Sequence, residues 1–557
     1  MSSTFGGFNT VVRGIAGNQL SLNTVGHNLS NAATEGYSRQ SVNLISVSGQ
    51  KVSTAYGEAI LGNGVDSMSI TRARNIYADR QYWDESSTKS YYETTQVNYD
   101  KLESIFNDTD NTGLKQAMEE FYQSWVSLSN AASDGPTRTT VVEKGTTVID
   151  RLQTAVAQLQ DQIVANYKDL QNYTQKTNEL AGQVVLLNRN IMMAESSGGS
   201  ANDLRDQRDA VIDELSQYVD VTVYEDDRGM YSVVSNGVSL VNGTSKLTLK
   251  ISDPINNVKY GITDYNVEIV ESGINFRSEN GKLRALKDTI AEDKGYIDNM
   301  VDIAATMLTT FNEQHQRGAG MDEARTGGIN FFGDEQMTYR WDNDKQCVMA
   351  VPTRISQTAV PDPADSKITN YTITKTFDSA KEEQISGVSI VNALCISRQI
   401  SEVGGQFKIA ASTIENLMAP TVSGNTETYT YTSDDLGGTG DGTNAVDISL
   451  LFNTAQASTK IPENTRAIGT VSLNNYYQAI MSKLGADSEA MDTKAEAQDK
   501  LITQITTWRS ETAGVDWNEE LTHMIMFQQG YSACSRCLTT MDEMLDKLIN
   551  GTGTVGR

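Results

Sequence analysis

"MIMFQQGYSACSRCLTTMDEMLDKLIN", residues 524–550, carries a regular apolar pattern near the end of this 557-residue chain. Its apolar residues follow one another at alternating steps of three and four positions: Met524, Phe527, Tyr531, Cys534, Leu538, Met541, Leu545 and Leu548. Such steps place every apolar side chain on one narrow stripe of an α-helix, as in a coiled coil. Asn550 and Gly551 then favour the end of the helix. We therefore expect a C-terminal helix that packs against another helix through this stripe.

The N-terminal segment shows the same pattern in a weaker form. Starting from Phe5, its stripe contains the apolar residues Phe8, Val12, Ile15, Leu22 and Leu29. Gln19 and Gly26 occupy the remaining stripe positions. A helix with one narrow apolar stripe is only marginally stable in water. We therefore expect the two termini to pair as coiled-coil helices, to use both stripes as an assembly seam, and to order fully only in an assembly.

Longer helical patterns lie between the termini. One stripe runs through a proline-free segment of about 55 residues: Leu159, Ile163, Leu170, Tyr173, Leu180, Val184, Leu187 and Ile191. A pattern of that length is typical of a coiled coil or an elongated helical bundle. Shorter helices are predicted over residues 203–218, 283–311 and 474–508.

Strand signals interrupt the helices in two places. After residue 219, β-branched and aromatic residues alternate and are punctuated by Arg228-Gly229 and Asn236-Gly237, as in β-hairpins. The second place is residues 334–467, which contain five of the seven prolines and many threonines and glycines. We interpret this second stretch as a β-rich domain inserted into the helical body and facing outward.

These patterns together predict a mainly α fold with β-rich insertions. We expect a terminal coiled-coil domain that lines a tube, formed by residues 1–60 with 515–557. An elongated helical body is expected from residues 61–333 with 468–514, including a small β subdomain at about 219–275. Residues 334–467 are expected to form the β-rich surface insert.

The charge balance excludes several classes of partner. The chain has 45 Lys plus Arg against 71 Asp plus Glu, a formal net charge of −26. Such an acidic chain does not suit a nucleic-acid backbone or an anionic membrane surface. No stretch approaches the roughly 18 consecutive apolar residues of a spanning helix, and the first residues lack the pattern of a secretory signal peptide. We expect no membrane insertion and no cleavable signal.

The residues that could carry catalysis or bind metal are few. The four cysteines are too few and too scattered for a disulfide framework. Cys534 and Cys537 match the C-x-x-C spacing, but they lie within the helical stripe, which favours core packing over redox chemistry or zinc binding. The three histidines, His27, His315 and His523, have no nearby nucleophile and acid, and we interpret them as structural.

Two further motifs have alternative interpretations. In "DTDNTGLKQAME", residues 108–119, the residues at EF-hand positions are Asp108, Asp110, Thr112, Gly113 and Glu119. Lys115 occupies a position that is usually apolar in an EF-hand, and no second copy of the motif follows. A turn between two helices is therefore a better interpretation of this stretch than a calcium-binding loop. "GGTGDG", residues 437–442, lacks the Lys-Ser or Lys-Thr pair of a phosphate loop and is interpreted as a flexible surface loop that opens no helix.

A polar, turn-prone stretch follows the first helix. In "NLSNAATEGYSRQ", residues 28–40, the side chains that can satisfy helix-end and turn backbone groups are Asn28, Asn31 and Thr34. Gly36 permits a sharp reversal of the chain, and Tyr37 offers an aromatic anchor. We interpret this motif as a hinge between the terminal helix and the outer body.

The paired terminal stripes and this hinge motif resemble the axial proteins of the bacterial flagellum, which share an Asn-rich, Thr-x-Gly-Tyr segment after the first helix. "SETAGVDWNEELTHMIMFQQGYSACSRCLTTMDEMLDKLIN", residues 510–550, is similar to the closing motif of that family. "LESIFNDTDNTGLKQAMEEFYQSW", residues 102–125, and two further internal stretches resemble the helical region of its hook-filament junction members. Trp517 and Gly530 depart from the usual residues of the closing motif.

The resemblance implies a structural, non-enzymatic protein without a cofactor or bound metal. It implies export without a cleavable signal through the flagellum's own type III apparatus, and an extracellular place at the hook-filament junction. The implied partners are other copies of the chain in a ring or tube, the hook protein, the second junction protein and an export chaperone. Two alternatives stay open from the residues: another axial member such as a hook or distal-rod protein, or a calcium-binding or enzymatic surface protein.

Overall fold

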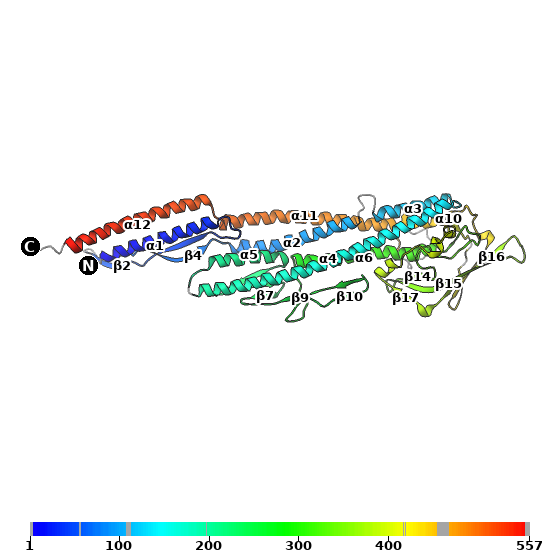
Figure 1. Ribbon diagram of the computed structural model, residues 1–557, viewed down its shortest axis with the longest axis horizontal. Coiled ribbons are helices and arrows are strands. Elements are labelled where there is room, and N and C mark those ends of the chain that lie inside the picture. The colour runs from blue at the N-terminus through cyan, green and yellow to red at the C-terminus, as the bar shows by residue number, and fades with distance from the viewer. Residues whose placement is uncertain are drawn as a thin grey trace, which may run out of the picture.

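The protein is an elongated assembly of long helices that run along one axis (Figure 1). This computed structural model describes residues 4–54, 57–106, 113–196, 198–415, 417, 419–453 and 467–551. Both described chain ends lie at one end of the molecule, and the β-rich insert lies at the other (Figure 1). The predicted fold class, mainly α with β-rich insertions and paired terminal helices, is confirmed.

The terminal part is a helix pair backed by a hairpin. Helix α1 (Thr4–Asn31) lies along α12 (Trp517–Gly551), and the two helices run in opposite directions (Figure 1). On another side α1 packs against β1 (Gln40–Ser46) and β4 (Val65–Arg72), which pair with each other antiparallel. Strands β2 (Gln50–Thr54) and β3 (Gly57–Leu61) extend this hairpin. The sequence patterns did not predict these strands, and the hairpin spans residue 60, where we expected a domain boundary.

The body is a bundle around one very long helix. Helix α4 (Gly135–Glu195) extends over 61 residues and begins at Asp134, whose carboxylate accepts the Thr137 backbone N–H at 3.0 Å. Pro136 follows in the first turn, where its missing N–H costs nothing. The other body helices are α2 (Ile76–Phe106), α3 (Leu114–Asn130), α5 (Asn202–Tyr218), α6 (Lys282–Thr306) and α11 (Leu473–Ala513).

The continuation of α6 is a π-helical turn, Met307–Phe311, followed by α7 (Asn312–His315). This turn directs Phe311 into an aromatic cluster whose members come from distant parts of the chain: Phe121, Trp125, Phe331, Phe332 and Phe452. All these rings are fully buried. They join α3, the end of α6, residues 331–332 and α10 (Thr443–Asn453) into one core.

A small β unit covers one side of α4. Its four-stranded antiparallel sheet contains β5 (Thr222–Glu225), β6 (Tyr231–Ser235), β7 (Val238–Asn242) and β8 (Ser245–Lys246). Asn236 and Gly237 join β6 to β7 with φ angles of 43° and 77°, as a type I′ turn requires. The shorter strands that follow are β9 (Leu249–Ile251), β10 (Ile255–Asn257), β11 (Ile262–Asp264) and β12 (Val267–Ile269).

The insert is built on a long bent strand. The first half of β15 (Cys347–Pro361) pairs with β14 (Met337–Asp342) and β17 (Glu383–Ile385), and its second half pairs with β16 (Thr369–Phe377). Strands β20 (Thr426–Thr432) and β19 (Thr421–Ser423) complete this sheet. Smaller elements are β13 (Gly318–Ala319), β18 (Ser412–Thr413), α8 (Val388–Asn392) and α9 (Arg398–Ser401).

The prediction that residues 437–442 open no helix is wrong. Helix α10 begins at Thr443, directly after this loop, and the Asp441 carboxylate accepts the Thr443 backbone N–H at 3.0 Å. The local sequence did not predict α10, because this helix is short and depends on the burial of Leu451 and Phe452 in the core. Among the residues that the structure describes, no helix combines the length and apolarity that crossing a membrane requires.

Candidate functional site: the terminal helices and their joint to the body

The contact between α1 and α12 follows a row of small and polar residues on α1. A Cβ added at Gly7 would lie 3.2 Å from Met541, and one added at Gly14 would lie 3.1 Å from Cys534. Asn18 in turn closely approaches Gly530. Large α12 side chains therefore pack against glycines of α1, which lets the two backbones come close together.

This row differs by one position from the predicted N-terminal stripe. Phe8, Ile15, Leu22 and Leu29 are partly buried beside the row, and the Val12 side chain is exposed. A shift of one residue turns a helix face by about 100°. The reason is steric: α1 lies between α12 and the hairpin, and Gly17 meets Leu44 and Val65 of the hairpin.

The predicted C-terminal stripe contacts α1 only in part. Met524, Phe527, Leu538, Met541 and Leu545 are partly buried, whereas Tyr531 and Leu548 are exposed. Glu520 is the single α12 residue that is fully buried among those the structure describes. As an assembly seam these residues stay a prediction.

Apolar side chains of α12 are also exposed on the described chain near both ends of the helix. They are Leu521, Ile525 and Met526 near its start, and Met544, Leu548 and Ile549 near its end. Exposed apolar side chains grouped on a helix are typical of a surface that packs against another molecule. This arrangement can support self-association.

The hinge motif lies where the terminal helices meet the body. Asn28 is 1% exposed, and its amide donates to the Gln40 carbonyl at 2.9 Å and to Glu520 at 3.1 Å. The Tyr37 hydroxyl and the Gln40 backbone N–H donate back to the Asn28 side-chain oxygen at 2.8 and 3.0 Å. Burial, and then Asp203, raise the pKa of Tyr37. Asn28 is thus the central hydrogen-bonding residue of this joint.

The rest of the motif forms a tight turn against α5. The Asn31 amide donates to the His27 carbonyl at 3.1 Å, and the Thr34 hydroxyl contacts the Asn31 side chain at 3.4 Å. Gly36 has a φ of 77°, and a Cβ added there would lie 3.3 Å from Ala210. The motif is therefore held on several sides in the single chain.

Ion pairs connect this turn to α12. Arg39 donates to Glu520 at 2.7 Å and to Glu519 at 3.2 Å, and its backbone N–H donates to the Ala513 carbonyl at 2.8 Å. Asp516 caps α12 by accepting the Asn518 backbone N–H at 2.7 Å. The change of direction between α11 and α12 is thereby tied to the end of α1.

A buried network of arginines and aspartates holds the joint to the body. Arg72 contacts Asp206 and Asp209 of α5, both at 2.7 Å, and the Ser38 backbone N–H donates to Asp206 at 2.8 Å. Burial lowers the pKa of Arg72, but Asp209 and Asp206 outweigh it, so the net pKa shift is upward. Paired, hydrogen-bonded buried charges of this kind fix one geometry, because breaking one partner leaves a charge out of water.

The same network reaches α2 and α11. Arg509 of α11 contacts Asp79 of α2 at 2.9 Å and Asp213 of α5 at 2.8 Å, and Arg74 contacts Asp79 at 2.8 Å. Burial raises the pKa of Asp213 although Arg509 opposes the shift. Three helices, α2, α5 and α11, therefore meet the hairpin at one charged cluster.

Sequence reasoning missed this network, although a signal for it exists. Asp203, Asp206, Asp209 and Asp213 recur at three- and four-residue steps, which places them on one face of α5. Arg72 is the last residue of β4, and Arg74 follows it by two positions. The sequence could not show that the aspartates and arginines meet, because more than a hundred residues separate them.

The other candidate residues are scattered. Cys534 packs on Gly14, and Cys537 is exposed. His315 is buried; its Nδ1 lies 2.9 Å from the Ile329 carbonyl and its Nε2 accepts the Ala410 N–H at 3.0 Å. Burial lowers the pKa of His315 to about 4, so the ring is neutral.

His27, His523 and the calcium-like motif are the remaining candidate sites. His27 lies 3.2 Å from Asp203, and His523 lies beside Phe527. Asp108, Asp110 and Thr112 of the calcium-like motif lie outside the described residues. Within the described ranges, no group of three or more His, Cys, Asp or Glu residues could hold a metal ion.

Comparisons with known proteins find flagellar proteins along the whole chain. Residues 99–332 match the family described as Flagellar hook-associated protein FlgK helical domain, and residues 509–551 match Flagellar basal body rod FlgEFG protein C-terminal. The flagellar hook-associated protein 1 of Bacillus subtilis is 26% identical over 596 residues, covering 100% of both chains. That of Escherichia coli is 24% identical and covers 97% of this chain and 99% of its own.

A solved structure shares the fold. The flagellar hook junction protein FlgK from Burkholderia pseudomallei aligns with a TM-score of 0.55 at 15% identity, covering 77% of this chain and 99% of its own. The alignment with the Bacillus subtilis protein covers the terminal helices of this chain and their joint to the body. Over its full length this chain is similar to flagellar hook-associated protein 1, and its central helices match the helical-domain model of that protein.

Proposed function

We propose that this chain is a structural subunit of the bacterial flagellum that forms the junction between hook and filament, where the filament is later built. The observation that carries this proposal is the terminal helix pair, because the folded chain leaves many of its apolar side chains exposed. Full-length similarity to flagellar hook-associated protein 1 supports the same role. The protein acts by assembling and not by catalysis.

The assembly seam is formed by the two predicted stripes. Neighbouring subunits cover the side chains that the single chain leaves exposed, among them Val12, Tyr531 and Leu548. The terminal part, residues 1–60 with 515–557, lines the tube, and residues 61–333 with 468–514 form the outer body. Residues 334–467 form the surface insert.

A single charge in the seam tests this role. Leu538→Asp should abolish incorporation into flagella, because a carboxylate cannot be buried between apolar helices without a partner. Thr540→Asp is the matched control, since Thr540 is exposed on another face of α12. Immunogold labelling in the electron microscope should show wild type and the control at the hook-filament junction. Normal labelling of Leu538→Asp would contradict the seam.

Ordering of the terminal helices is coupled to assembly. A helix pair with little buried surface opens readily, which suppresses polymerisation away from the growing tip. Limited trypsin digestion of the monomer should cut α12 at Arg536 and Lys547 well before the body. If both ends resist trypsin as long as the body does, the coupling is wrong.

The partners are other copies of this chain, the hook protein, the second junction protein and an export chaperone. The chaperone covers the apolar α12 surface before export, which proceeds without a cleavable signal to an extracellular location. A chain that lacks residues 515–557 should lose chaperone binding in pull-down experiments. Binding that survives this deletion would place the chaperone site elsewhere.

The joint at Asn28, Asn31, Thr34, Gly36 and Tyr37 is the hinge that sets the angle between the terminal helices and the body. Gly36→Val should impair assembly or swimming, since valine is strained at a φ of 77° and would meet Ala210. Immunogold labelling of the junction separates a failure to bend from a failure to assemble. Normal swimming of a Gly36→Val strain would contradict the hinge role.

A further inference from the structure

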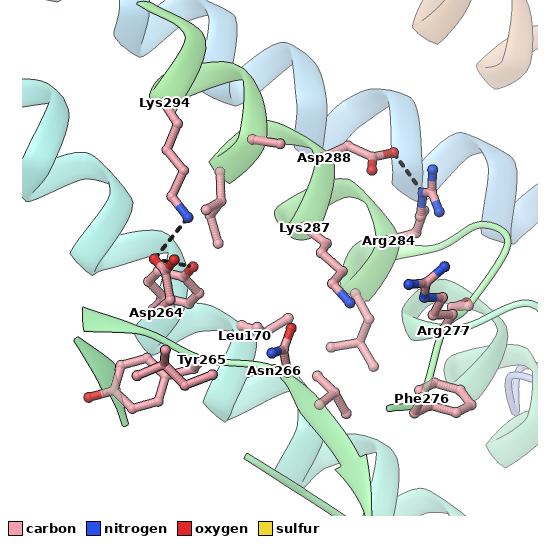
Figure 2. A pocket seen from close by; sticks show the side chains of 17 residues that line it. Leu170, Asp264, Tyr265, Asn266, Phe276, Arg277, Arg284, Lys287, Asp288 and Lys294 are labelled. Carbon is pink, nitrogen blue, oxygen red and sulfur yellow. Dashed lines mark hydrogen bonds and ion pairs between the residues drawn. The ribbon is translucent and has the colours of Figure 1, made fainter. Parts of the chain in front are cut away.

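A pocket in the helical body has an excess of positive charge. It lies between α4, α6 and the chain segments around residues 264–267 and 276–278 (Figure 2). Its volume is about 420 Å³, within the range of sites that bind small organic molecules. Four cationic side chains line it, Arg277, Arg284, Lys287 and Lys294, against the two carboxylates Asp264 and Asp288.

Both carboxylates are fully engaged with other groups. Asp264 accepts Lys294 at 2.8 Å, the Tyr167 hydroxyl at 2.9 Å and the Asn257 amide at 2.8 Å. Asp288 accepts Arg284 at 2.7 Å and the Tyr91 hydroxyl at 3.2 Å. Figure 2 shows these two ion pairs on opposite sides of the pocket.

The other two cations have no partner of this kind. Within the part of the chain that the structure describes, the side chains of Arg277 and Lys287 form no ion pair and no hydrogen bond. Figure 2 shows both in the space between α6 and the strand segments, with Asn266 nearby. Burial, followed by Arg277 and Arg284, lowers the pKa of Lys287, although Asp288 opposes the shift. Arg277 and Lys287 therefore give the pocket two positive charges beyond those that Asp264 and Asp288 pair with.

The walls beside these cations are apolar and well packed. Leu170, Phe276, Leu283 and Ile290 line the pocket and are each at most 4% exposed. A ligand that fits must therefore bring an anionic group for Arg277 and Lys287 and an apolar body for this wall. Arginine and lysine together bind carboxylate and phosphate through charge-assisted hydrogen bonds.

We propose that this pocket binds a small organic anion, with its carboxylate or phosphate held by Arg277 and Lys287 and its apolar part against Leu170, Leu283 and Ile290. Binding neutralises the local charge excess and ties α6 to the β unit. The site is independent of the seam and of the junction role.

Titration calorimetry on the full chain tests the site with four probes. They are 3-phenylpropionate, its neutral analogue 3-phenylpropionamide, phenyl phosphate and inorganic phosphate. We expect at least one of the two aromatic anions to bind about tenfold or more tightly than the amide and than inorganic phosphate. The stronger of the two identifies the anionic group as a carboxylate or a phosphate.

Lys287→Gln and Arg277→Gln should each weaken binding of that probe about tenfold, whereas the control Lys500→Gln, which alters an exposed lysine of α11, should not. Melting curves give a second measurement: the probe should raise the Tm of wild type and of Lys500→Gln but leave Lys287→Gln unchanged. Free Lys287→Gln should melt at or above the wild-type temperature, because a repelling charge is gone.

Three results would overturn the proposal. One is equal binding of the amide and the anions, and another is wild-type affinity in a folded Lys287→Gln protein. The third is no binding of either aromatic anion up to about 10 mM, a concentration that would reveal even a weak specific site.

Discussion

The terminal helix α12 and the body helix α4 have the same kind of apolar stripe but very different surroundings. Helix α4 is covered by α3, α5, α6 and the β unit, and its stripe residues Leu159, Ile163, Leu180 and Val184 are 0% exposed. Among the described elements, α12 packs chiefly along α1, and Glu520 is its one buried residue. The main hydrophobic core, as far as the structure describes it, contains no residue of α1 or α12. Identical periodicity therefore supports a stable body in one place and an incomplete surface in the other.

The largest loss of stability should come from the aromatic cluster of the body. Phe121 is 0% exposed, and its ring packs against Phe311 and Phe452. Phe121→Ala should lower the free energy of unfolding by about 3–5 kcal/mol, measured by urea denaturation. Val164→Ala, at an exposed position of α4, should change it by less than about 0.5 kcal/mol. Equal effects of the two would mean that the cluster does not hold the body together.

The second prediction concerns pH and the body core. Asp293 is 0% exposed and accepts hydrogen bonds from Asn98 at 2.9 Å and Asn166 at 3.2 Å, and burial raises its pKa to about 7. The native state thus keeps a proton that the unfolded state releases above its pKa of about 4, so stability falls as pH rises from 4 to 7. The loss attributable to Asp293 should be about 2–4 kcal/mol over this range.

Asp293→Asn should remove that pH dependence and stabilise the body above pH 7, because the amide carries no charge to bury. The Gln162 side-chain oxygen, which has no hydrogen-bond partner within the described structure, is available to accept from the new amide. Urea denaturation at pH 5, 6, 7 and 8 measures both effects. Parallel pH profiles for wild type and variant would show that Asp293 is ionised in the native state throughout.

The third prediction separates the terminal pair from the body. Glu520→Ala removes the buried carboxylate that accepts Arg39 at 2.7 Å and Asn28 at 3.1 Å. It should favour local opening of α12 by about 2–3 kcal/mol, since Arg39 and Asn28 lose a buried partner. Hydrogen exchange should rise in α12 while the body keeps its protection. Glu519→Ala, at an exposed carboxylate on the same arginine, should cost at most about 1 kcal/mol.

The smallest effect on the monomer is expected at Val12, which is 40% exposed on α1. Val12→Ser should change monomer stability by less than about 0.5 kcal/mol, because the folded chain leaves this side chain in water. The same variant should weaken assembly, if neighbouring subunits cover Val12. Flagellar incorporation measures the effect on assembly, and the Tm of the monomer measures the effect on stability. A destabilised monomer would show that Val12 packs within its own chain.

The joint shows where sequence reasoning reached its limit. The turn chemistry of Asn28 and Gly36 is local, and the structure shows both in turn or helix-end roles. The partners of this turn come from α5 and α12, about 170 and 490 residues further along the chain. The local sequence does not indicate which aspartate contacts which arginine. The hairpin of residues 40–72 was missed for a related reason, since several of its residues are exposed and its alternation is weak.

The sequence by itself determined the helical periodicity, the ends of the long helices and the Asn236-Gly237 turn, because each depends on backbone preferences and side chains a few residues apart. Only the tertiary structure decided which face of α1 meets α12, since glycines admit the close approach that the larger stripe residues prevent. It also decided that Arg277 and Lys287 share one pocket and that three helices meet at one cluster of charges. These depend on contacts between residues far apart in the chain, which periodicity does not encode.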